Sequence, residues 1–382
     1  MDFKLTTEQV AMRAEARAFA NEVVAPGADV RDQTKAFPEE ALQAAAEKGY
    51  LGLLVPTQYG GNALGNLAQC FILEEVARAD ASTHVTISVH NSLVTGPIKI
   101  WGSEVLKQRF LPRLATGEFI GAYALTEPQS GSDAAALSCS ATRDGDDWVI
   151  SGTKMWITSG QRADVVIVFA RTDTNASATK GISAFVVDAN QPGMTSGKCE
   201  NKTGIRASET VQLFLDDVRV PNDQLLGEEN RGFNYALETL NGGRIGIATQ
   251  SVGVAQAALD AVLHGFDGKD APKGSAFSTQ DVDFAISDIA TRIEAARFLV
   301  WRAAQLRDRD EDHVREASMA KLFASQTANE VCRQAVELLG ARGWRAEGHV
   351  ERFLRDARVT EIYEGTTEIQ KLVIVRALKA AR

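Results

Sequence analysis

The stretch Asp144-Gly145-Asp146-Asp147-Trp148-Val149-Ile150-Ser151-Gly152 places a tight Asp/Gly turn directly before a run of β-prone residues. A turn of this composition beside such a run is typical of a β-hairpin. Three more short apolar runs follow at 165–170, 182–187 and 211–215, with turn residues between them. Together they predict a small antiparallel β-domain, either a barrel or a sandwich, in the middle of the chain.

The residues before this β-segment have the periodicity of helices. Thr6-Thr7-Glu8-Gln9 has the form of a capping box at the start of an Ala-rich run. Pro38 and Gly49 stand where a second helix would begin and end, and a third helical stretch covers 67–78. Ser103 is placed to cap a fourth helix. The first third of the chain is therefore predicted to be helical.

After the β-segment the helical period returns in three long Ala-rich runs at 237–263, 282–306 and 314–339. Long helices separated by short breaks are typical of a bundle. The expected fold is α+β, with an N-terminal helical domain (1–120), a middle antiparallel β-barrel or sandwich (121–231) and a C-terminal four-helix bundle (232–382).

The composition is that of a globular protein, with 382 residues of which 45% are hydrophobic and 24% charged. A formal net charge of -9 argues against general binding of nucleic acid or anionic membranes. The longest aliphatic run, Val165 to Ala170, is too short to span a bilayer. The four cysteines form no CxxC pair and the histidines no HExxH, so we expect no catalytic metal and a cytoplasmic location.

Two segments of the middle region have residues suited to a flat ligand. The stretch 123–133 ends a strand in a turn rich in hydroxyls and free N–H groups, which suits a heterocycle or a phosphate. An ordinary interdomain loop has the same composition. In 154–160, Trp156 and Thr158 alternate along a strand, so one face carries a ring and a hydroxyl. A buried core Trp is the alternative.

Three segments of the C-terminal region have unusual glycines. Gly242 and Gly243 lie inside a predicted helix, where each costs about 1 kcal/mol relative to alanine, so either a close approach or a tight helix crossing requires them. The Gly-rich break at 339–344 also fits a plain helix C-cap. In 362–370, Glu364 precedes a helix-breaking Gly365; walled by apolar neighbours it would act as a base, and otherwise it is a solvated charge.

In their order and spacing these segments resemble the acyl-CoA dehydrogenase family over essentially the whole chain. The resemblance is closest to the short-chain, butyryl-CoA branch through residues 88–93, 202–208 and 358–370. It implies a helical domain, a β-domain and a four-helix bundle, in agreement with the pattern above. It also implies FAD as cofactor, electron-transferring flavoprotein as acceptor, and a homo-oligomer, usually a homotetramer.

The resemblance further implies roles for single residues. Glu364 matches the catalytic base, while Gly243 occupies the place where other branches carry theirs. The base would remove the α-proton of a short acyl-CoA while the β-hydride leaves to flavin N5, giving a trans-2-enoyl-CoA. Residues that match cofactor-binding positions are Tyr123, Leu125, Thr126, Ser132, Trp156, Thr158, Thr366 and Glu368. Residues that match substrate-binding positions are Ser132, Asn241, Arg244 and Gly365.

Several departures from the family pattern cluster at the part of the FAD site that a neighbouring subunit completes. Lys269 and Pro272 stand where Arg and Phe are usual, and Glu337 replaces a Gln. Ala341 replaces a glycine there as well, and Gln129 replaces a usual glycine elsewhere, in the flavin loop. Lys lacks the bidentate fork of Arg, and a carboxylate near a pyrophosphate is unfavourable. These changes predict loosely held FAD.

Three alternatives to an ordinary short-chain enzyme remain open at this point. The first is an enzyme whose thioester substrate is bound to a carrier protein or carries an unusual acyl group. The second is one half of a heteromer whose partner supplies the missing Arg and Phe. The third is a non-catalytic homologue that binds acyl-CoA or a partner. The intact segment 363–366 argues against this last alternative.

Overall fold

The computed structural model describes residues 4–266, 277–346 and 349–381. Lys269 and Pro272 lie outside the described residues, so what was expected of them stays a prediction. Thr6 and Gln9 form the predicted capping box, and Ser103 caps its helix by accepting the Leu106 N–H. The elements before the first strand are α1 (Thr7–Phe19), η1 (Ala20–Val24), α2 (Ala28–Thr34), α3 (Glu39–Glu47), η2 (Thr57–Tyr59), α4 (Asn66–Ala79), α5 (Ala81–Val89), η3 (His90–Thr95), α6 (Gly96–Trp101) and α7 (Glu104–Ala115).

The middle region is one seven-stranded sheet of order β1-β4-β2-β3-β7-β6, with β5 paired to β4. It is mixed rather than purely antiparallel as expected, because β1 and β4 run parallel. The chain makes the β2–β3 hairpin between them and crosses back, which permits parallel pairing. The elements are β1 (Gly121–Ala124), η4 (Ala134–Ala136), β2 (Ser140–Asp144), β3 (Asp147–Thr158), β4 (Val165–Arg171), β5 (Ile182–Asp188), β6 (Met194–Ser196), β7 (Thr210–Pro221) and η5 (Asn222–Gln224).

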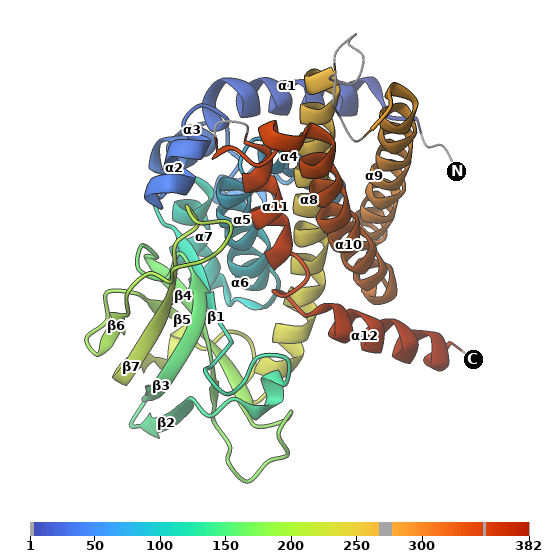
Figure 1. Cartoon of the computed structure of the whole chain (residues 1–382). Coiled ribbons are helices and arrows are strands. Elements are labelled where there is room, and N and C mark those ends of the chain that lie inside the picture. The colour runs from blue at the N-terminus through green and yellow to red at the C-terminus, as the bar shows by residue number, and fades with distance from the viewer. Residues whose placement is uncertain (1–3, 267–276, 347–348, 382) are drawn as a thin grey trace.

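The C-terminal region contains the long predicted helices, of which α8, α9 and α10 lie side by side, while α12 projects away from them (Figure 1). The exact domain bounds at 120/121 and 231/232 stay a prediction, although the elements change type close to both. The elements are α8 (Gly232–Phe266), α9 (Thr279–Asp308), α10 (Val314–Leu339), η6 (Gly340–Arg342), α11 (Val350–Val359) and α12 (Thr367–Ala380).

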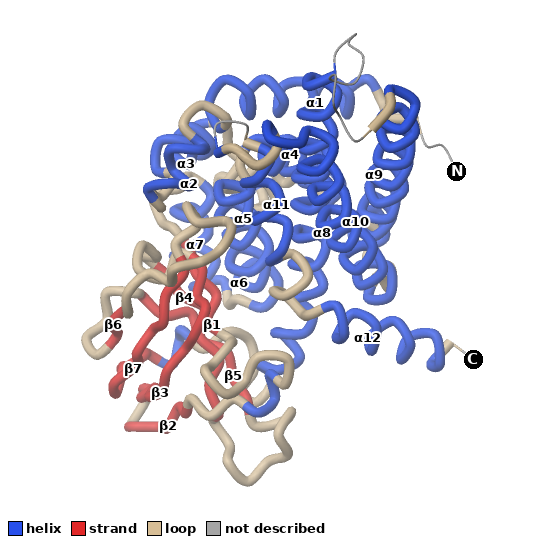
Figure 2. Tube along the Cα trace, in the orientation of Figure 1, coloured by secondary structure: helices blue, strands red, loops and turns tan. Residues whose placement is uncertain are grey.

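The helices of both flanks share one hydrophobic core, because α8 packs against α10 and α9 as well as against α4 and α5. A separate core fills the interior of the β-domain around the fully buried Trp148. The strands therefore gather at one end of a continuous helical body (Figure 2). Residues that lie between the two cores are placed by both the sheet and the bundle.

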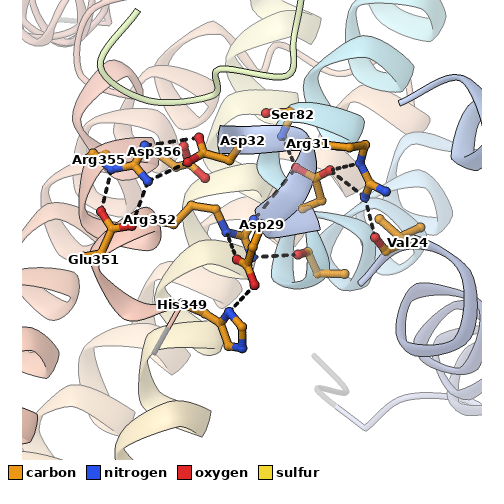
Figure 3. A network of polar contacts seen from close by, with 12 residues as sticks. Val24, Asp29, Arg31, Asp32, Ser82, His349, Glu351, Arg352, Arg355 and Asp356 are labelled. Atoms are coloured by element: carbon orange, nitrogen blue, oxygen red, sulfur yellow. Dashed lines mark hydrogen bonds and ion pairs between the residues drawn. The ribbon is translucent and has the colours of Figure 1, made fainter. Parts of the chain in front are cut away.

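A network of ion pairs joins the N-terminal helices to the C-terminal region (Figure 3). Arg355 on α11 pairs with Asp32 on α2 at 2.7 Å. The neighbouring Asp356 is buried and accepts the N–H of Ile205 from the β-domain at 2.5 Å. Burial raises the pKa of Asp356 to about 7. The network fixes α11, the helix that leads into the turn containing Glu364.

Candidate active site

Glu364 lies in the tight turn between α11 and α12. Its φ is 53°, and the following Gly365 has a φ of 94°. A left-handed conformation is rare for a non-glycine residue and is often found at functional sites. Thr366 then caps α12 by accepting the N–H of Ile369 at 3.4 Å. The helix break therefore holds the glutamate in one strained conformation.

The Glu364 carboxyl is turned inward. Its Oε2 atom is buried and has no hydrogen-bond partner within the described residues. Burial raises its pKa to about 7, although Lys321 and Arg244 act in the opposite direction. A carboxylate that titrates near neutral pH is suited to take and release a proton. The alternative of a solvated surface charge is therefore wrong.

The glycines of α8 make room for this carboxylate. A Cβ atom on Gly243 would lie 1.6 Å from Glu364 Oε2, and one on Gly242 would lie 1.8 Å from Arg307 Nη1. The close approach that the sequence predicted is thus made by a carboxylate and a guanidinium. A side chain at position 243 and the Glu364 carboxylate would therefore occupy the same space.

Polar side chains of α8 surround the base. Arg244 donates to Asn241 Oδ1 at 2.7 Å, and both residues are buried. Burial lowers the pKa of Arg244, and the charge of Glu364 partly restores it. Gln250, which lies C-terminal to Arg244 on the same helix, accepts a hydrogen bond from the Tyr363 hydroxyl. Contact of Asn241 and Arg244 with a CoA tail stays a prediction.

Lys321 is a residue of the site that the sequence analysis missed. It lies on α10, is fully buried, and its Nζ donates to the backbone oxygen of Gly365 at 2.6 Å. Burial lowers its pKa to about 8, against the raising effect of Glu364. A sequence signal exists, since Lys321 interrupts the apolar stripe formed by Ala317, Ala324 and Ala328.

The β-domain supplies the facing wall of the site. Tyr123 is buried on β1, and its hydroxyl has no hydrogen-bond partner among the described residues. Burial and the charge of Glu364 both raise its pKa, so the two side chains lie within electrostatic reach. Leu125, just after β1, is also buried. The Thr126 backbone oxygen accepts the Met155 N–H at 2.8 Å, which joins this segment to β3.

Trp156 presents an exposed ring next to that junction. It is 52% exposed and has a φ of 61°, and the pairing of β3 with β7 shifts register between Lys154 and Ile157. Trp156 is therefore no core tryptophan. Trp156 and Thr158 flank the buried Ile157, as alternation predicts, although the strand is irregular at Trp156.

These residues fit a flavin. An exposed indole offers a flat apolar face, and aromatic rings pack favourably in offset stacks. Within the described residues the hydroxyls of Thr126 and Thr158 make no hydrogen bond, so both can donate to or accept from a bound heterocycle. The segments 123–126 and 156–158 could thus hold the ring between the sheet and the Glu364 turn.

A buried ion pair supports the loop after β1. Glu127 pairs with Lys154 at 2.8 Å, and both side chains are almost fully buried. Glu127 also accepts the N–H groups of Ser138 and Cys139 at 2.7 Å and 2.9 Å. Burial alone would raise the pKa of Glu127, but the ion pair and these hydrogen bonds lower it. The loop is therefore anchored at both ends.

The remaining predicted residues lie outside this inner group. Ser132 is exposed in the loop, and Glu368 is exposed in the first turn of α12. Glu337 is half-exposed and pairs with Arg333 at 2.5 Å, so its charge is partly compensated. Their roles toward a cofactor stay predictions. No cluster of three or more metal-ligating side chains occurs in the part of the chain that the structure describes.

A cavity of about 430 Å³ lies between α6, α8 and the α9–α10 connection, and Glu364 is not among the residues that line it. Arg307, which lies against Gly242, is part of its wall. Lys99 adds a second cation, and acidic residues including Glu238 line the same space.

Comparison with known proteins agrees with this geometry. The acyl-CoA dehydrogenase N-terminal, middle and C-terminal domain models match residues 6–118, 122–218 and 230–379. A mitochondrial short-chain specific acyl-CoA dehydrogenase of Mus musculus is 45% identical over 363 residues, covering 95% of this chain and 88% of that protein.

Two solved structures share the whole fold. The butyryl-CoA dehydrogenase of Megasphaera elsdenii has a TM-score of 0.95 at 37% identity, covering 99% of this chain and 100% of that one. A chain from work on the electron transferring flavoprotein of Acidaminococcus fermentans has a TM-score of 0.95 at 39% identity, covering 99% of both chains. The chain therefore belongs to the acyl-CoA dehydrogenase family, whose members are FAD-dependent oxidoreductases.

Proposed function

We propose that this protein catalyses the flavin-dependent α,β-dehydrogenation of a short-chain acyl-CoA, with Glu364 as the base. The observation that carries the proposal is the Glu364 carboxyl, which is buried, unpartnered within the described chain, and has a pKa of about 7. The 45% identity to a short-chain specific enzyme supports the choice of substrate. A carrier-bound thioester remains the alternative that an assay must exclude.

Several residues of the chain have separate roles in proton removal. Glu364 Oε2 takes the α-proton, and the cations Lys321 and Arg244 favour its ionised form. Within the described residues the backbone N–H of Glu364 donates to no acceptor, so it can bind the thioester oxygen as negative charge develops. Tyr123 and Tyr363 exclude water from the carboxylate. A bound flavin supplies the acceptor for the β-hydride.

The flavin is proposed to lie against the β-domain wall. Tyr123, Leu125, Thr126, Trp156 and Thr158 meet there, next to the turn that holds the base. Substrate contacts are proposed from Gly365 and from the buried pair of Asn241 and Arg244. The outer residues proposed to reach the cofactor or its neighbourhood are Ser132, Glu337, Thr366 and Glu368, with Lys269 among the residues outside the description.

The surface of α12 supports assembly into a homo-oligomer. This helix projects from the body of the molecule (Figure 1) and exposes Leu372, Val375 and Leu378. Apolar side chains gathered on a projecting helix are typical of a subunit interface. We propose a homotetramer, as in the family, with electron-transferring flavoprotein as the acceptor. The similarity to a chain from work on such a flavoprotein supports that acceptor.

We further propose a cytoplasmic enzyme with no membrane span. Helix α8 is long and apolar enough to cross a bilayer, but most of it is buried against the other helices, so it is a core helix. The four cysteines are free, and three of them are buried. Unpaired cysteines agree with a reducing compartment.

The function is tested with purified protein by its visible spectrum and by anaerobic reduction with butanoyl-CoA. We expect protein supplied with excess FAD to show a flavin spectrum that butanoyl-CoA bleaches rapidly. Dodecanoyl-CoA is expected to react at least about tenfold more slowly, because each methylene that the pocket cannot bury loses roughly 1 kcal/mol. Equal rates would contradict the short-chain assignment. Colourless protein that gains flavin only with a second chain would support the heteromer.

A further inference from the structure

A fully buried lysine lies behind the catalytic turn. Lys321 is 0% exposed, and among the described residues the Gly365 oxygen is the hydrogen-bond acceptor of its ammonium, at 2.6 Å. A lysine is almost never fully buried unless a partner compensates for the loss of water. Its neighbours one turn away on α10 are the small buried residues Ala317, Ser318, Ala324 and Ser325, and none of them carries a charge that would compensate a cation.

The hydrogen bond fixes a turn that is otherwise strained. Glu364 and Gly365 both have left-handed backbone conformations, which the surrounding structure must hold in place. The Gly365 oxygen accepts from Lys321 and also from Gln370 Nε2 at 2.9 Å. Two buried donors from α10 and α12 therefore converge on one carbonyl oxygen, directly after the base.

The same ammonium also lies within electrostatic reach of the Glu364 carboxylate. The charged groups around Glu364 are Lys321 from α10 and Arg244 from α8, with the phenols of Tyr123 on β1 and Tyr363 beside it. Lys321 is the stronger of the two cations that lower the pKa of Glu364. Glu361 and Glu368 lie within reach of Lys321 as well. Burial raises the pKa of Glu364 and the Lys321 charge lowers it, so loss of that charge would let the pKa rise further.

We propose that Lys321 is a positioning residue for proton removal: its ammonium holds the Glu364–Gly365 turn through the Gly365 carbonyl and places a buried positive charge within electrostatic reach of the Glu364 carboxylate. The proposal rests on Glu364 being the base. Because Lys321 acts through the turn and through its charge, its effect differs from that of a residue needed only for stability. A structural role alone would not move the titration of Glu364.

The test compares Lys321→Met, which removes donor and charge, with Lys321→Arg, which keeps both. The matched control is Lys180→Met, which removes one exposed lysine charge from the β4–β5 connection. The first readout is the infrared carboxyl band of 13C-glutamate-labelled protein as a function of pH, assigned to Glu364 by its absence from Glu364→Gln. The second is the rate of flavin reduction by butanoyl-CoA over the same pH range.

We expect Lys321→Met to raise the Glu364 midpoint by about one pH unit or more, which lowers the rate about fivefold at pH 7 and tenfold at pH 6. Lys321→Arg restores most of the midpoint, and Lys180→Met leaves both readouts unchanged. An unchanged midpoint in folded Lys321→Met would overturn the proposal. If that variant does not fold, Lys321→Gln removes the charge while keeping a donor, and the same shift is required of it.

The two proposals fail in different ways. If butanoyl-CoA does not reduce the flavin of the wild-type protein at any pH, the short-chain function is wrong. The infrared titration still measures the effect of Lys321 on Glu364 in that case. If the wild-type protein reacts normally and the midpoint does not move, only the role of Lys321 is wrong.

Discussion

Two glutamates with buried carboxyl oxygens lie near buried lysines in the β-domain and in the helical region, and their surroundings differ. Glu127 forms a direct ion pair with Lys154 at 2.8 Å and accepts two backbone N–H groups. Glu364 has an unpartnered Oε2 atom within the described chain, while the nearby Lys321 donates to the Gly365 carbonyl instead. The first carboxyl has a lowered pKa, and the second a pKa raised to about 7.

This difference separates a structural carboxylate from a reactive one. A buried carboxylate whose oxygens are all bound has no free position for a proton, and it holds its loop in place. A buried carboxylate without partners is costly in its ionised form, so it gains from accepting a proton. Residue type and burial are shared by Glu127 and Glu364, and hydrogen bonding distinguishes them.

The largest effect on stability is expected from Glu127→Gln. This change leaves the Lys154 ammonium buried without an opposite charge, which should lower the free energy of unfolding by about 3–5 kcal/mol. Denaturant unfolding followed by circular dichroism measures it. The double variant Glu127→Leu/Lys154→Met should be more stable than Glu127→Gln. If Glu127→Gln unfolds like the wild type, the ion pair is not a structural anchor.

A methyl group beside the base should reduce activity strongly without unfolding the protein. Gly243→Ala would place a Cβ atom 1.6 Å from Glu364 Oε2, so the carboxylate must move. We expect flavin reduction by butanoyl-CoA to fall about 100-fold, as misplacement by about 1 Å can cause. Thermal unfolding should change little, because alanine favours a helix by about 1 kcal/mol.

Gly265→Ala is the matched control in the same helix. A Cβ atom there meets the far end of the Leu339 side chain, away from the base. Its rate should stay within about twofold of the wild type, since the reacting groups are not displaced. If Gly243→Ala and Gly265→Ala lower the rate of flavin reduction equally, α8 tolerates no added methyl group. The contact between position 243 and Glu364 would then not explain the loss of activity.

The pH dependence of stability should reveal the raised pKa of Glu364. Below pH 4.5 the carboxyl is protonated in both folded and unfolded chains, and as pH rises through about 7 the folded state loses stability. Glu364→Gln lacks this loss, so its advantage should grow over that window to about 3 kcal/mol at most. Asp356 also has a pKa of about 7, but it is present in both proteins and cancels.

Urea unfolding at pH 4.5, 6, 7 and 8 gives this difference directly. An advantage that stays constant from pH 4.5 to 8 would mean that the folded state does not perturb Glu364. An advantage that decreases with pH would mean that its pKa is lowered, as for Glu127.

The smallest effect is expected from Glu337→Gln. The side chain is half-exposed and paired with Arg333, and exposed ion pairs contribute about 0–1 kcal/mol. We therefore expect FAD affinity, measured by flavin fluorescence, to rise about fivefold at most. A gain of a hundredfold would show that this carboxylate faces the pyrophosphate directly. Lys269→Arg provides the parallel test for the residue outside the description.

Local signals in the sequence predicted much of the fold. Helices begin and end at capping residues such as Thr6 and Ser103, and these caps depend only on neighbours a few residues away. The glycine after Glu364 indicates a helix break and leaves a base or a solvated charge open, and the resemblance to the family implies the base. The glycines at 242 and 243 were unusual enough to predict a close approach, although the sequence did not show which groups approach them.

The features that the sequence did not reveal depend on contacts between distant segments. The partner of Lys321 is 44 residues away, on the turn after the base. The parallel pairing of β1 with β4 depends on how the chain crosses the sheet. The π-helical segment η3 lies where Leu93 meets the Gly243 position, and the left-handed Trp156 follows from a register shift with β7. Each of these is decided by tertiary packing.

The most direct test of the account is anaerobic stopped-flow reduction of the flavin by butanoyl-CoA in wild type and Glu364→Gln between pH 5.5 and 9. We predict that the wild-type rate rises with pH through about 7 and then levels off. Glu364→Gln should bind flavin and fold normally but react at least about 1000-fold more slowly, because a general base contributes roughly 10²–10⁴-fold. Reduction of the Glu364→Gln flavin at a rate near that of the wild type would contradict the assignment of Glu364 as the base.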